Sequence, residues 1–357
     1  MTERKMATHL QDQGAHPETA AHERTAASSS SEPALSLPKG QALGFPVDAR
    51  TGARLKHVVE SQQFTVPLLM ELFARTRGVE RVVARGGTLD YQNRIMATLF
   101  YAPSMRTRFS FEAAMHRLGG RVLSTEQAGA FSSEIKAEQV EDTIRIIAGY
   151  CDVIVIRHNA ADGARRAAQV SPVPVISAGD GNGGQHPTQA LLDLYTIYRE
   201  RPINGLSVAI IGELDKGRTA RSLAYLLAKF ERVKIFFVSP PELQMKPDIL
   251  EYLEEHDVCY ELESDLERVI GEVDMVYQTR IHPERLQDAS RGSLHRYALD
   301  SAMVQRMKPD ALILHPLPRT AELDKSVDDD PRALYFRQAK NGLYVRMALL
   351  TMLLEGN

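Results

Sequence analysis

The segment Ser104–Arg108 has the residue types and spacing of an anion-binding helix start. Ser104 is the expected N-cap, and Arg106, Thr107 and Arg108 occupy the first turn of a predicted helix. Cations at this end of a helix oppose its macrodipole, so helix stability alone does not account for them. Backbone N–H groups, a hydroxyl and two guanidinium groups would together bind a phosphate or a phosphate ester. A solvated basic turn is the alternative interpretation.

Other polar residues stand where a parallel sheet would place ligand-binding groups, just after a strand or at the start of a helix. Arg157 and His158 follow a predicted buried strand, 152–156. His186 and Gln189 begin a helix after a glycine-rich loop. A histidine can donate there to a carbonyl oxygen, and the glutamine offers both a donor and an acceptor. Taken alone, a buried arginine–carboxylate pair and a simple helix-initiating turn remain alternative interpretations.

The second half of the chain carries further arginines at the ends of predicted strands. Arg218 begins the helix after one strand, and Arg280 and Arg285 follow another, with His282 between them. The loop before Arg218 lacks the G-x-G-x-x-G pattern, and the next strand ends in Ser239 rather than an acid. A dinucleotide-dependent dehydrogenase is therefore not expected. Arg218 remains a candidate ligand for an anion.

A proline-rich turn, residues 315–318 (HPLP), follows the last predicted strand. Two prolines around Leu317 remove backbone donors and fix the direction of the chain. Carbonyl oxygens that face a cleft there would accept hydrogen bonds from the N–H groups of a substrate. The sequence has no H-E-x-x-H motif, no paired cysteines and no carboxylate cluster, so we expect no metal ion.

Helical and strand-like patterns alternate from Lys56 onward, which indicates βαβ units and parallel sheets. A break at Pro202 and Gly205 separates two successive series. The predicted strands are 95–101, 152–156, 173–177, 206–211, 233–238, 275–278 and 311–314, and the predicted helices are 66–75, 105–118, 140–150, 165–170, 188–199, 219–229, 247–255, 266–271 and 344–354.

This pattern predicts an α/β fold with two consecutive parallel-sheet domains and the active site in the cleft between them. The first domain is expected to span residues 51–187, and the pattern leaves open to which domain the last helix returns. The second domain is expected to span residues 188–341, with the boundary close to Gln189.

The composition is typical of a soluble globular protein of two domains. Of the 357 residues, 43% are hydrophobic and 25% are charged. The net charge of −3 gives no reason to expect nucleic acid or an anionic membrane as a partner, and no apolar run approaches the ~20 residues that span a bilayer. Two cysteines in no paired spacing, Cys151 and Cys259, indicate a reducing compartment, so we expect a cytoplasmic protein.

Residues 1–50 differ in composition from the rest of the chain. They contain a serine run at 28–31, mixed charges and no periodic apolar face, and such a segment cannot offset its ordering entropy. Acids such as Glu3 and Asp12 are unusual in a transit peptide. A disordered tail is therefore favoured, and import into an organelle stays open.

Three motifs together have the order and spacing typical of transcarbamoylases. They are SMRTR at 104–108, HPTQ at 186–189 and HPLPR at 315–319. From about Lys56 to its C-terminus, the chain resembles the aspartate/ornithine carbamoyltransferase family. GRT at 217–219 and TR…ER within 279–285 point to the catalytic chain of the aspartate branch.

The resemblance implies transfer of a carbamoyl group from carbamoyl phosphate to the amino group of L-aspartate, an early step of pyrimidine synthesis that needs no cofactor. It makes 51–187, completed by the C-terminal helix 342–357, the carbamoyl-phosphate-binding domain, and 188–341 the aspartate-binding domain. It also leaves a regulatory subunit or another enzyme of the pathway open as a partner.

The resemblance also implies roles for individual residues. The phosphate would be bound by Ser104, Met105, Arg106, Thr107 and Arg157. The carbamoyl oxygen would contact Thr107, Arg157 and His186, and the carbamoyl NH₂ would contact Gln189 and the carbonyls of Pro316 and Leu317. The carboxylates of aspartate would be bound by Arg218 and Arg280, beside Leu317. Two residues, Ser132 and Lys136, match positions that enter the neighbouring subunit's site, which implies a homotrimer with shared active sites.

Three departures from the family pattern bear on the substrate. Met105 replaces a usual threonine and is shared with the acetylornithine branch, His282 replaces a usual glutamine, and Ala137 replaces a usual glycine. An ornithine or acetylornithine carbamoyltransferase is therefore one alternative, and a non-catalytic homologue is another. The ornithine branch needs an acid for a cationic side chain, whereas Arg218 and Arg280 are two cations on the acceptor side.

Overall fold

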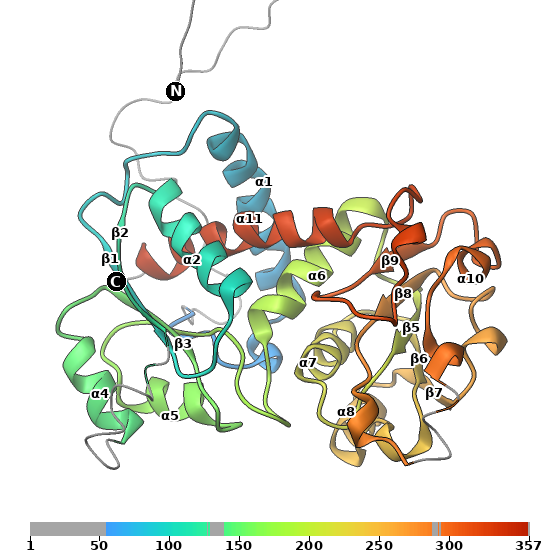
Figure 1. Ribbon diagram of the computed structural model, residues 1–357. Helices are drawn as coiled ribbons and strands as arrows, with labels where there is room; N and C mark the ends of the chain where they lie inside the picture. Colours follow the sequence, from blue (N-terminus) through green and yellow to red (C-terminus); the bar gives the residue numbers. More distant parts are fainter. Residues whose placement is uncertain (1–54, 127, 129–138, 288–291, 293, 356–357) are drawn as a thin grey trace, which may run out of the picture. The chain divides into compact units, whose positions relative to one another are not determined.

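The computed structural model describes residues 55–126, 128, 139–287, 292 and 294–355 (Figure 1). These residues form two parallel-sheet α/β domains, as the sequence predicts. The predicted tail and the loop that contains Ser132 and Lys136 lie outside the described residues. No helix in the described ranges combines the length and apolarity needed to cross a bilayer.

The first domain contains a four-stranded parallel sheet in the order β2-β1-β3-β4. Its strands are β1 (Ile95–Phe100), β2 (Arg121–Glu126), β3 (Val153–Arg157) and β4 (Val175–Ser177), and its helices are α1 (Val66–Ala84), α2 (Met105–Arg117), α4 (Val140–Ile147), α5 (Gly163–Val170) and α6 (Pro187–Glu200). Phe100 pairs with Glu126 on one side and with Arg157 on the other. This register places Arg157 beside the loop that leads from β1 into α2.

The second domain contains a five-stranded parallel sheet in the order β7-β6-β5-β8-β9. Its strands are β5 (Ser207–Ile211), β6 (Lys234–Val238), β7 (Cys259–Glu263), β8 (Met275–Gln278) and β9 (Leu312–Leu314), and its helices are α7 (Arg218–Leu227), α8 (Pro247–Glu255) and α10 (Ser301–Gln305). The last helix, α11 (Tyr335–Leu354), follows this sheet in the chain but packs mainly against helices of the first domain. Ile211 pairs with Gln278, and Tyr277 pairs with Leu314. The carboxyl ends of β5, β8 and β9 therefore lie next to one another, and so do the loops that follow these strands.

Short 3₁₀ turns connect several of these elements: η1 (Ser61–Gln63), η2 (Pro241–Leu243), η3 (Leu266–Arg268), η4 (Pro283–Arg285), η5 (Leu294–Tyr297) and η6 (Lys325–Val327). The predicted helix 266–271 is wrong beyond its first residues, because only the turn η3 forms there. A segment of six residues with one covered face makes too few hydrogen bonds to repay helix nucleation.

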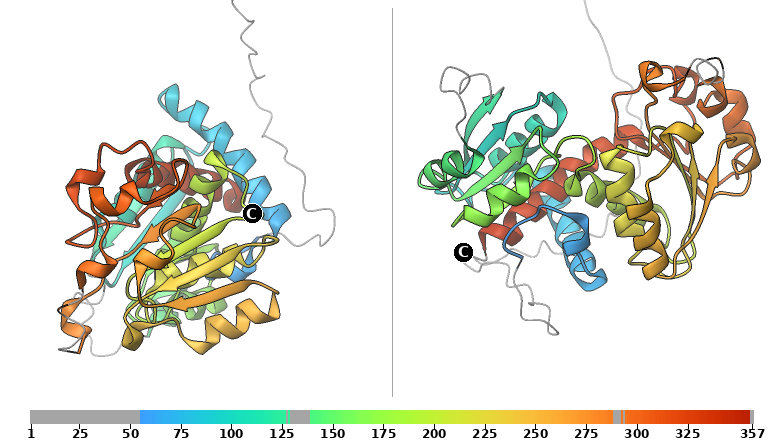
Figure 2. Two further views of the ribbon diagram at one scale, coloured as in Figure 1. Left: turned by 90° about the vertical axis from the view of Figure 1, so that its right-hand side faces the viewer. Right: turned by 90° about the horizontal axis from the view of Figure 1, so that it is seen from below.

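The central helices join the two domains through one continuous apolar core. This core contains buried side chains from α1, α2, α6, α7 and α11 and from one face of each sheet. Helix α11 packs against α1, α2 and α6, and Figure 2 shows α6 and α11 running side by side between the sheets. The C-terminal helix begins at Tyr335, before its predicted start. The division of the chain near Gln189 stays a prediction, because that residue lies in the first turn of α6.

Strands β2 and β7 were not expected from the sequence, and both lie at an edge of a sheet. Most of their residues are exposed or half-buried, whereas every residue of β3 is buried. A buried parallel strand shows as a continuous apolar run, and an edge strand with polar side chains does not. The pattern therefore reveals the strands whose residues are buried, including β4 and β9 at the opposite edges, and misses the two polar edge strands, β2 and β7.

Candidate active site

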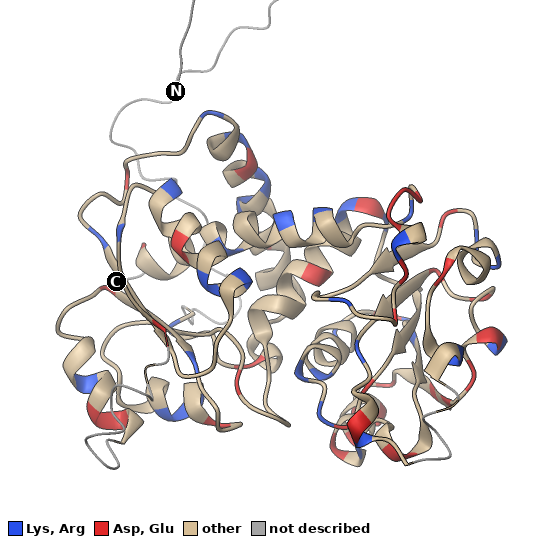
Figure 3. Cartoon of the chain, viewed as in Figure 1, with Lys and Arg blue, Asp and Glu red and all other residues tan. Residues whose placement is uncertain are grey.

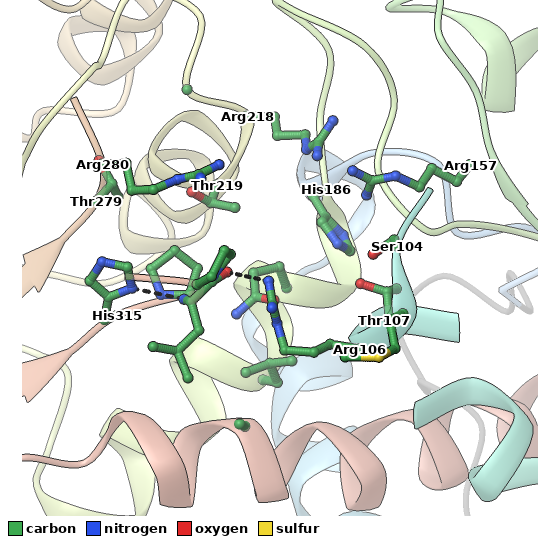
Figure 4. A pocket seen from close by; sticks show the side chains of 18 of the residues that line it. Ser104, Arg106, Thr107, Arg157, His186, Arg218, Thr219, Thr279, Arg280 and His315 are labelled. Atoms are coloured by element: carbon green, nitrogen blue, oxygen red, sulfur yellow. Dashed lines mark hydrogen bonds between the residues drawn. The ribbon is translucent and has the colours of Figure 1, made fainter. Parts of the chain in front are cut away.

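A cavity of about 650 Å³ lies between the two domains (Figure 4). Its lining comes from the segments that follow β1, β3, β5, β8 and β9 and from the starts of α2, α6 and α7. The carboxyl ends of both parallel sheets thus open onto the same space, which is where α/β sheets bind ligands.

The cavity brings together eleven residues that the sequence singled out. They are Ser104, Met105, Arg106, Thr107, Arg157, His186, Gln189, Arg218, Arg280, Pro316 and Leu317. Figure 4 shows Ser104, Arg106 and Thr107 on one side of the space and Thr279, Arg280 and His315 on the other. The two remaining candidates, Ser132 and Lys136, lie outside the described residues.

Three helices begin at the cavity wall with free N-terminal ends. The N-cap residues of α2, α6 and α7 are Ser104, His186 and Gly217, and none makes a side-chain capping bond. Unpaired backbone N–H groups and the positive ends of three helix dipoles therefore face one space. This arrangement favours a ligand with several negative charges.

The lining is strongly basic. Charged residues of both signs are mixed along the outer helices of both domains (Figure 3). Of the residues that the structure describes, the cavity lining instead contains one lysine, Lys216, and two acids, Glu126 and Glu213, together with five arginines: Arg106, Arg157, Arg218, Arg280 and Arg346. The local excess of positive charge arises although the whole chain is slightly acidic.

Three of these arginines donate hydrogen bonds to neutral backbone carbonyl oxygens. Arg106 donates from Nη2 to the carbonyl of Leu317 at 2.8 Å, and Arg157 donates from Nη1 to the carbonyl of Ala178 at 3.0 Å. Arg218 donates to a backbone carbonyl at 2.7 Å, that of residue 180. A bound anion can replace such contacts with charge-assisted ones, which are stronger.

Burial and mutual repulsion act on the same arginines. Burial, followed by the charges of Arg218 and Arg106, lowers the pKa of Arg157 to about 10. Burial and Arg280 lower the pKa of Arg106. Both groups remain charged at neutral pH, and each is repelled by a neighbouring guanidinium group. Binding of an anion would relieve this repulsion.

His186 is held as a neutral imidazole beside the arginines. Burial, with added repulsion from Arg218, Arg157 and Arg346, lowers its pKa well below 6.5. Its approach to Arg157 depends on Gly179, which has a φ of 104°. A Cβ at Gly179 would lie 2.9 Å from Cδ2 of His186 and 3.0 Å from Nη1 of Arg157. Only glycine lets these two donors meet.

The HPLP turn presents backbone carbonyls to the cavity. Leu317 has a φ of 52°, a conformation rare outside glycine, and its N–H donates to Nδ1 of His315 at 2.8 Å. Nε2 of His315 lies 3.0 Å from Oε1 of Glu322, and burial lowers the pKa of this histidine. The neutral Nε2–H tautomer satisfies both contacts. Strained residues of this kind collect at ligand sites.

Three residues that the sequence placed near anion sites have other partners. Arg108 pairs with Glu112 and Glu126 and does not line the cavity, so the second guanidinium expected at the α2 start is absent from it. The ring of His158 lies 4.8 Å from that of Tyr101. Arg285 is paired with two carboxylates, those of residues 213 and 215. None of the three is a candidate ligand in this structure.

Sequence reasoning missed two polar cavity residues that come from α11, Gln338 and Arg346. Arg346 is buried and donates from Nη1 to the hydroxyl of Ser110 at 2.8 Å. A single arginine inside the apolar run 344–354 was the available signal. Among the described residues, no group of three or more His, Cys, Asp or Glu side chains is placed to hold a metal ion.

Comparison with known proteins agrees with this geometry. The model of the family described as "Aspartate/ornithine carbamoyltransferase, carbamoyl-P binding domain" matches residues 56–199, and that described as "Aspartate/ornithine carbamoyltransferase, Asp/Orn binding domain" matches residues 204–353. The chain belongs to the aspartate/ornithine carbamoyltransferase family. The resemblance found in the motifs is confirmed, and it covers both domains.

Similar proteins of the family carry the aspartate name. A chloroplastic aspartate carbamoyltransferase of Oryza sativa subsp. japonica is 51% identical over 85% of this chain and 86% of its own length. An aspartate carbamoyltransferase catalytic subunit of Methanopyrus kandleri is 46% identical over 84% of this chain and 98% of its own. An aspartate transcarbamoylase from Trypanosoma cruzi, solved with carbamoyl phosphate and aspartate, superposes with a TM-score of 0.79 at 37% identity, over 84% of this chain and 95% of that one.

Proposed function

We propose that this protein transfers the carbamoyl group of carbamoyl phosphate to the amino group of L-aspartate, giving N-carbamoyl-L-aspartate and phosphate in pyrimidine biosynthesis. One observation carries the proposal. A single cavity holds anion ligands from both domains, Arg106 and Arg157 from the first and Arg218 and Arg280 from the second. The Trypanosoma cruzi relative, solved with both substrates, supports the same pair of ligands here.

The start of α2 binds the phosphate in this proposal. Ser104 and Thr107 supply hydroxyls, Met105 a backbone N–H, and Arg106 a guanidinium, with Arg157 opposite. Negative charge accumulates on the phosphate as the C–O bond breaks. Contacts that strengthen at that moment accelerate the reaction, because they stabilise the transition state more than the bound substrate.

The carbonyl carbon is the site of attack. The neutral amino group of aspartate adds to it, the N–C bond forms, and the carbonyl oxygen becomes an oxyanion before phosphate leaves with the C–O electron pair and the amine loses a proton. Thr107, Arg157 and neutral His186 are the donors that face this oxygen in the proposal. Preorganised donors of this kind contribute about 3–4 kcal/mol each to lowering the barrier.

The carbamoyl NH₂ binds to acceptors on the far wall. These are the side-chain oxygen of Gln189 and the carbonyls of Pro316 and Leu317. In this structure Arg106 donates a hydrogen bond to the carbonyl of Leu317. When the substrate binds, its phosphate takes over Arg106 and its NH₂ group takes over the carbonyl, so both groups exchange one partner for a better one.

Arg218 and Arg280 bind the two carboxylates of aspartate, beside Leu317. A cationic acceptor such as ornithine would need a free acid instead. Glu213 is an acid of the cavity on this side, but it is engaged by Arg285 and by Nδ1 of His282, the latter at 2.8 Å. The acceptor side is therefore suited to a dicarboxylate.

The direct test offers the purified protein carbamoyl phosphate with aspartate, ornithine or acetylornithine in parallel and identifies the product by mass. Carbamoylaspartate is expected with aspartate, and no turnover with the other two. Turnover of ornithine or acetylornithine would replace the acceptor assignment. No turnover with any of them would support a non-catalytic homologue.

We further propose a cytoplasmic homotrimer in which Ser132 and Lys136 of one subunit complete the site of the next. This follows from the match of these two residues to the family pattern. To test it, the variants Lys136→Ala and His186→Ala are dissociated and reassociated together. Each is expected to be inactive alone, and mixed trimers are expected to regain at most about one third of wild-type activity, since one interface in three pairs two intact residues. Inactive mixed trimers would disprove a shared site.

A further inference from the structure

Asp193 is a fully buried carboxylate directly behind the cavity wall. Its Oδ1 accepts hydrogen bonds from Nε2 of Gln189 at 2.8 Å and from Nε2 of Gln338 at 2.6 Å. Its Oδ2 accepts one from the hydroxyl of Tyr277 at 2.6 Å. The three donors come from α6, α11 and β8, so one acid links both domains under the site. None of the steps proposed above uses it.

The orientation of the Gln338 amide follows from its two partners. The backbone N–H of His315 can only donate, and it lies 2.9 Å from Oε1 of Gln338. The carboxylate of Asp193 can only accept, and it faces Nε2. Both partners demand the same orientation. Gln338 thereby ties Asp193 to the start of the HPLP turn.

Gln189 is oriented by the same carboxylate. Because its Nε2 donates to Asp193, its oxygen Oε1 is the end of the amide left to the cavity that Gln189 lines. This wall therefore presents hydrogen-bond acceptors, namely Oε1 and the carbonyls of the HPLP turn. The rest of the lining, dominated by arginines and helix N-termini, presents donors.

We propose that Asp193 is a positioning residue that makes the site selective for an acyl phosphate with an N–H donor over one with a methyl group. Its acceptor-only chemistry fixes the acceptor end of Gln189 toward the carbamoyl NH₂. With the Gln189 amide turned over, NH₂ would face NH₂ and both groups would lose a hydrogen bond. This inference rests on the proposed function. It adds that Asp193 determines the preference of the site for a carbamoyl group over an acetyl group.

Acetyl phosphate is the probe, because it carries CH₃ where carbamoyl phosphate carries NH₂. Dissociation constants for carbamoyl phosphate, acetyl phosphate and inorganic phosphate are measured by calorimetry on the intact protein. Wild type is expected to prefer carbamoyl over acetyl phosphate by at least about 10-fold, since a buried acceptor without its donor is costly. Asp193→Ala is expected to lose most of this preference, with phosphate binding changed by less than about 2-fold.

Two matched variants separate positioning from a purely structural role. In Asp193→Asn the side-chain oxygen can still accept from both glutamines while the new NH₂ faces the oxygen of Tyr277, so the preference is expected to return. Tyr277→Phe removes the third hydrogen bond but leaves Oδ1 of Asp193 in place, so it is expected to lower the melting temperature and retain the preference. If Asp193→Ala does not fold, Asp193→Val, which fills the position without a hydrogen-bond acceptor, replaces it.

The outcomes are separable. A wild type that does not carbamoylate aspartate refutes the proposed function. A wild type that does so but binds both acyl phosphates equally refutes only the inference. The inference also fails if Asp193→Ala or Asp193→Val keeps the wild-type preference, or if Asp193→Asn loses it. Equal weakening of all three ligands would mean that Asp193 supports the fold alone.

Discussion

Arg218 and Arg221 lie three residues apart at the start of α7, and their surroundings are opposite. Arg218 lines the cavity and donates to the backbone carbonyl of Asp180. Arg221 is buried and forms an ion pair with Asp248 at the start of α8, with Nη1 3.1 Å from Oδ1. The partner of Arg221 is a carboxylate, whereas Arg218 donates its hydrogen bond to a neutral carbonyl oxygen.

The same division holds across the site. Arg106 and Arg157, which face the cavity, donate to carbonyl oxygens, whereas Arg285 at its margin is paired with Glu213 and Asp215. A substrate anion displaces a carbonyl at little cost, but displacing a carboxylate leaves a buried charge unpaired. The partner of an arginine, rather than its position along the chain, therefore indicates which arginines bind substrate.

The largest effect is expected for Arg218→Ala. Losing a bidentate contact to a substrate carboxylate removes two charge-assisted hydrogen bonds of about 1.5–3 kcal/mol each. The value of kcat/KM for aspartate should fall about 1000-fold, while the dissociation constant of phosphate changes little. Steady-state kinetics and calorimetry check this. Unchanged aspartate kinetics would contradict this role, because Arg218 would then bind substrate no more than Arg221 does.

Arg106→Ala is expected to lower kcat by at least about 100-fold, because its contact strengthens as phosphate leaves. The measurement is kcat at saturating concentrations of both substrates. A rise in the KM for carbamoyl phosphate with kcat unchanged would make Arg106 a uniform binder and contradict this role.

Burial beside the cavity arginines also makes the stability of the fold depend on pH through His186. Its folded pKa lies well below 6.5, so the unfolded chain binds more protons just below that pH. Stability should therefore fall as pH drops below about 6.5, by up to about 1.4 kcal/mol per pH unit from this residue. Thermal unfolding at pH 7.5 and 5.5 should show a smaller loss for His186→Gln than for wild type. His256→Gln, at an exposed site, should retain the wild-type loss.

The smallest kinetic effect is expected for Arg221→Ala, the control for Arg218→Ala. Asp248 is half-exposed, so water can solvate it once its partner is gone, and the ion pair contributes modestly. The melting temperature should fall by a few degrees, with kcat and both KM values within about 2-fold of wild type. A 10-fold loss of activity at full stability would place Arg221 in the site, and Arg218 and Arg221 would then no longer differ in role.

Much of the fold was predictable because its inner strands and central helices have continuous apolar patterns. Strand β8 and helix α8 have the predicted bounds, and α2, α6 and α7 begin within one residue of the expected positions. Eleven candidate ligands also converge as the motifs indicated, because polar residues after parallel strands collect at one edge of a sheet. Periodicity and strand-end chemistry are local properties, so the sequence carries them.

Tertiary structure decided which partner each polar group finds. Arg106 and Arg108 stand two residues apart in one basic turn, yet the first faces the cavity and the second pairs with Glu126 at the end of the neighbouring strand β2. Likewise, nothing along the chain joins Asp193 to Gln338, which is 145 residues away. Sequence fixes which groups can donate or accept, but strand order and helix packing determine which of them meet, because those contacts form through space after the chain has folded.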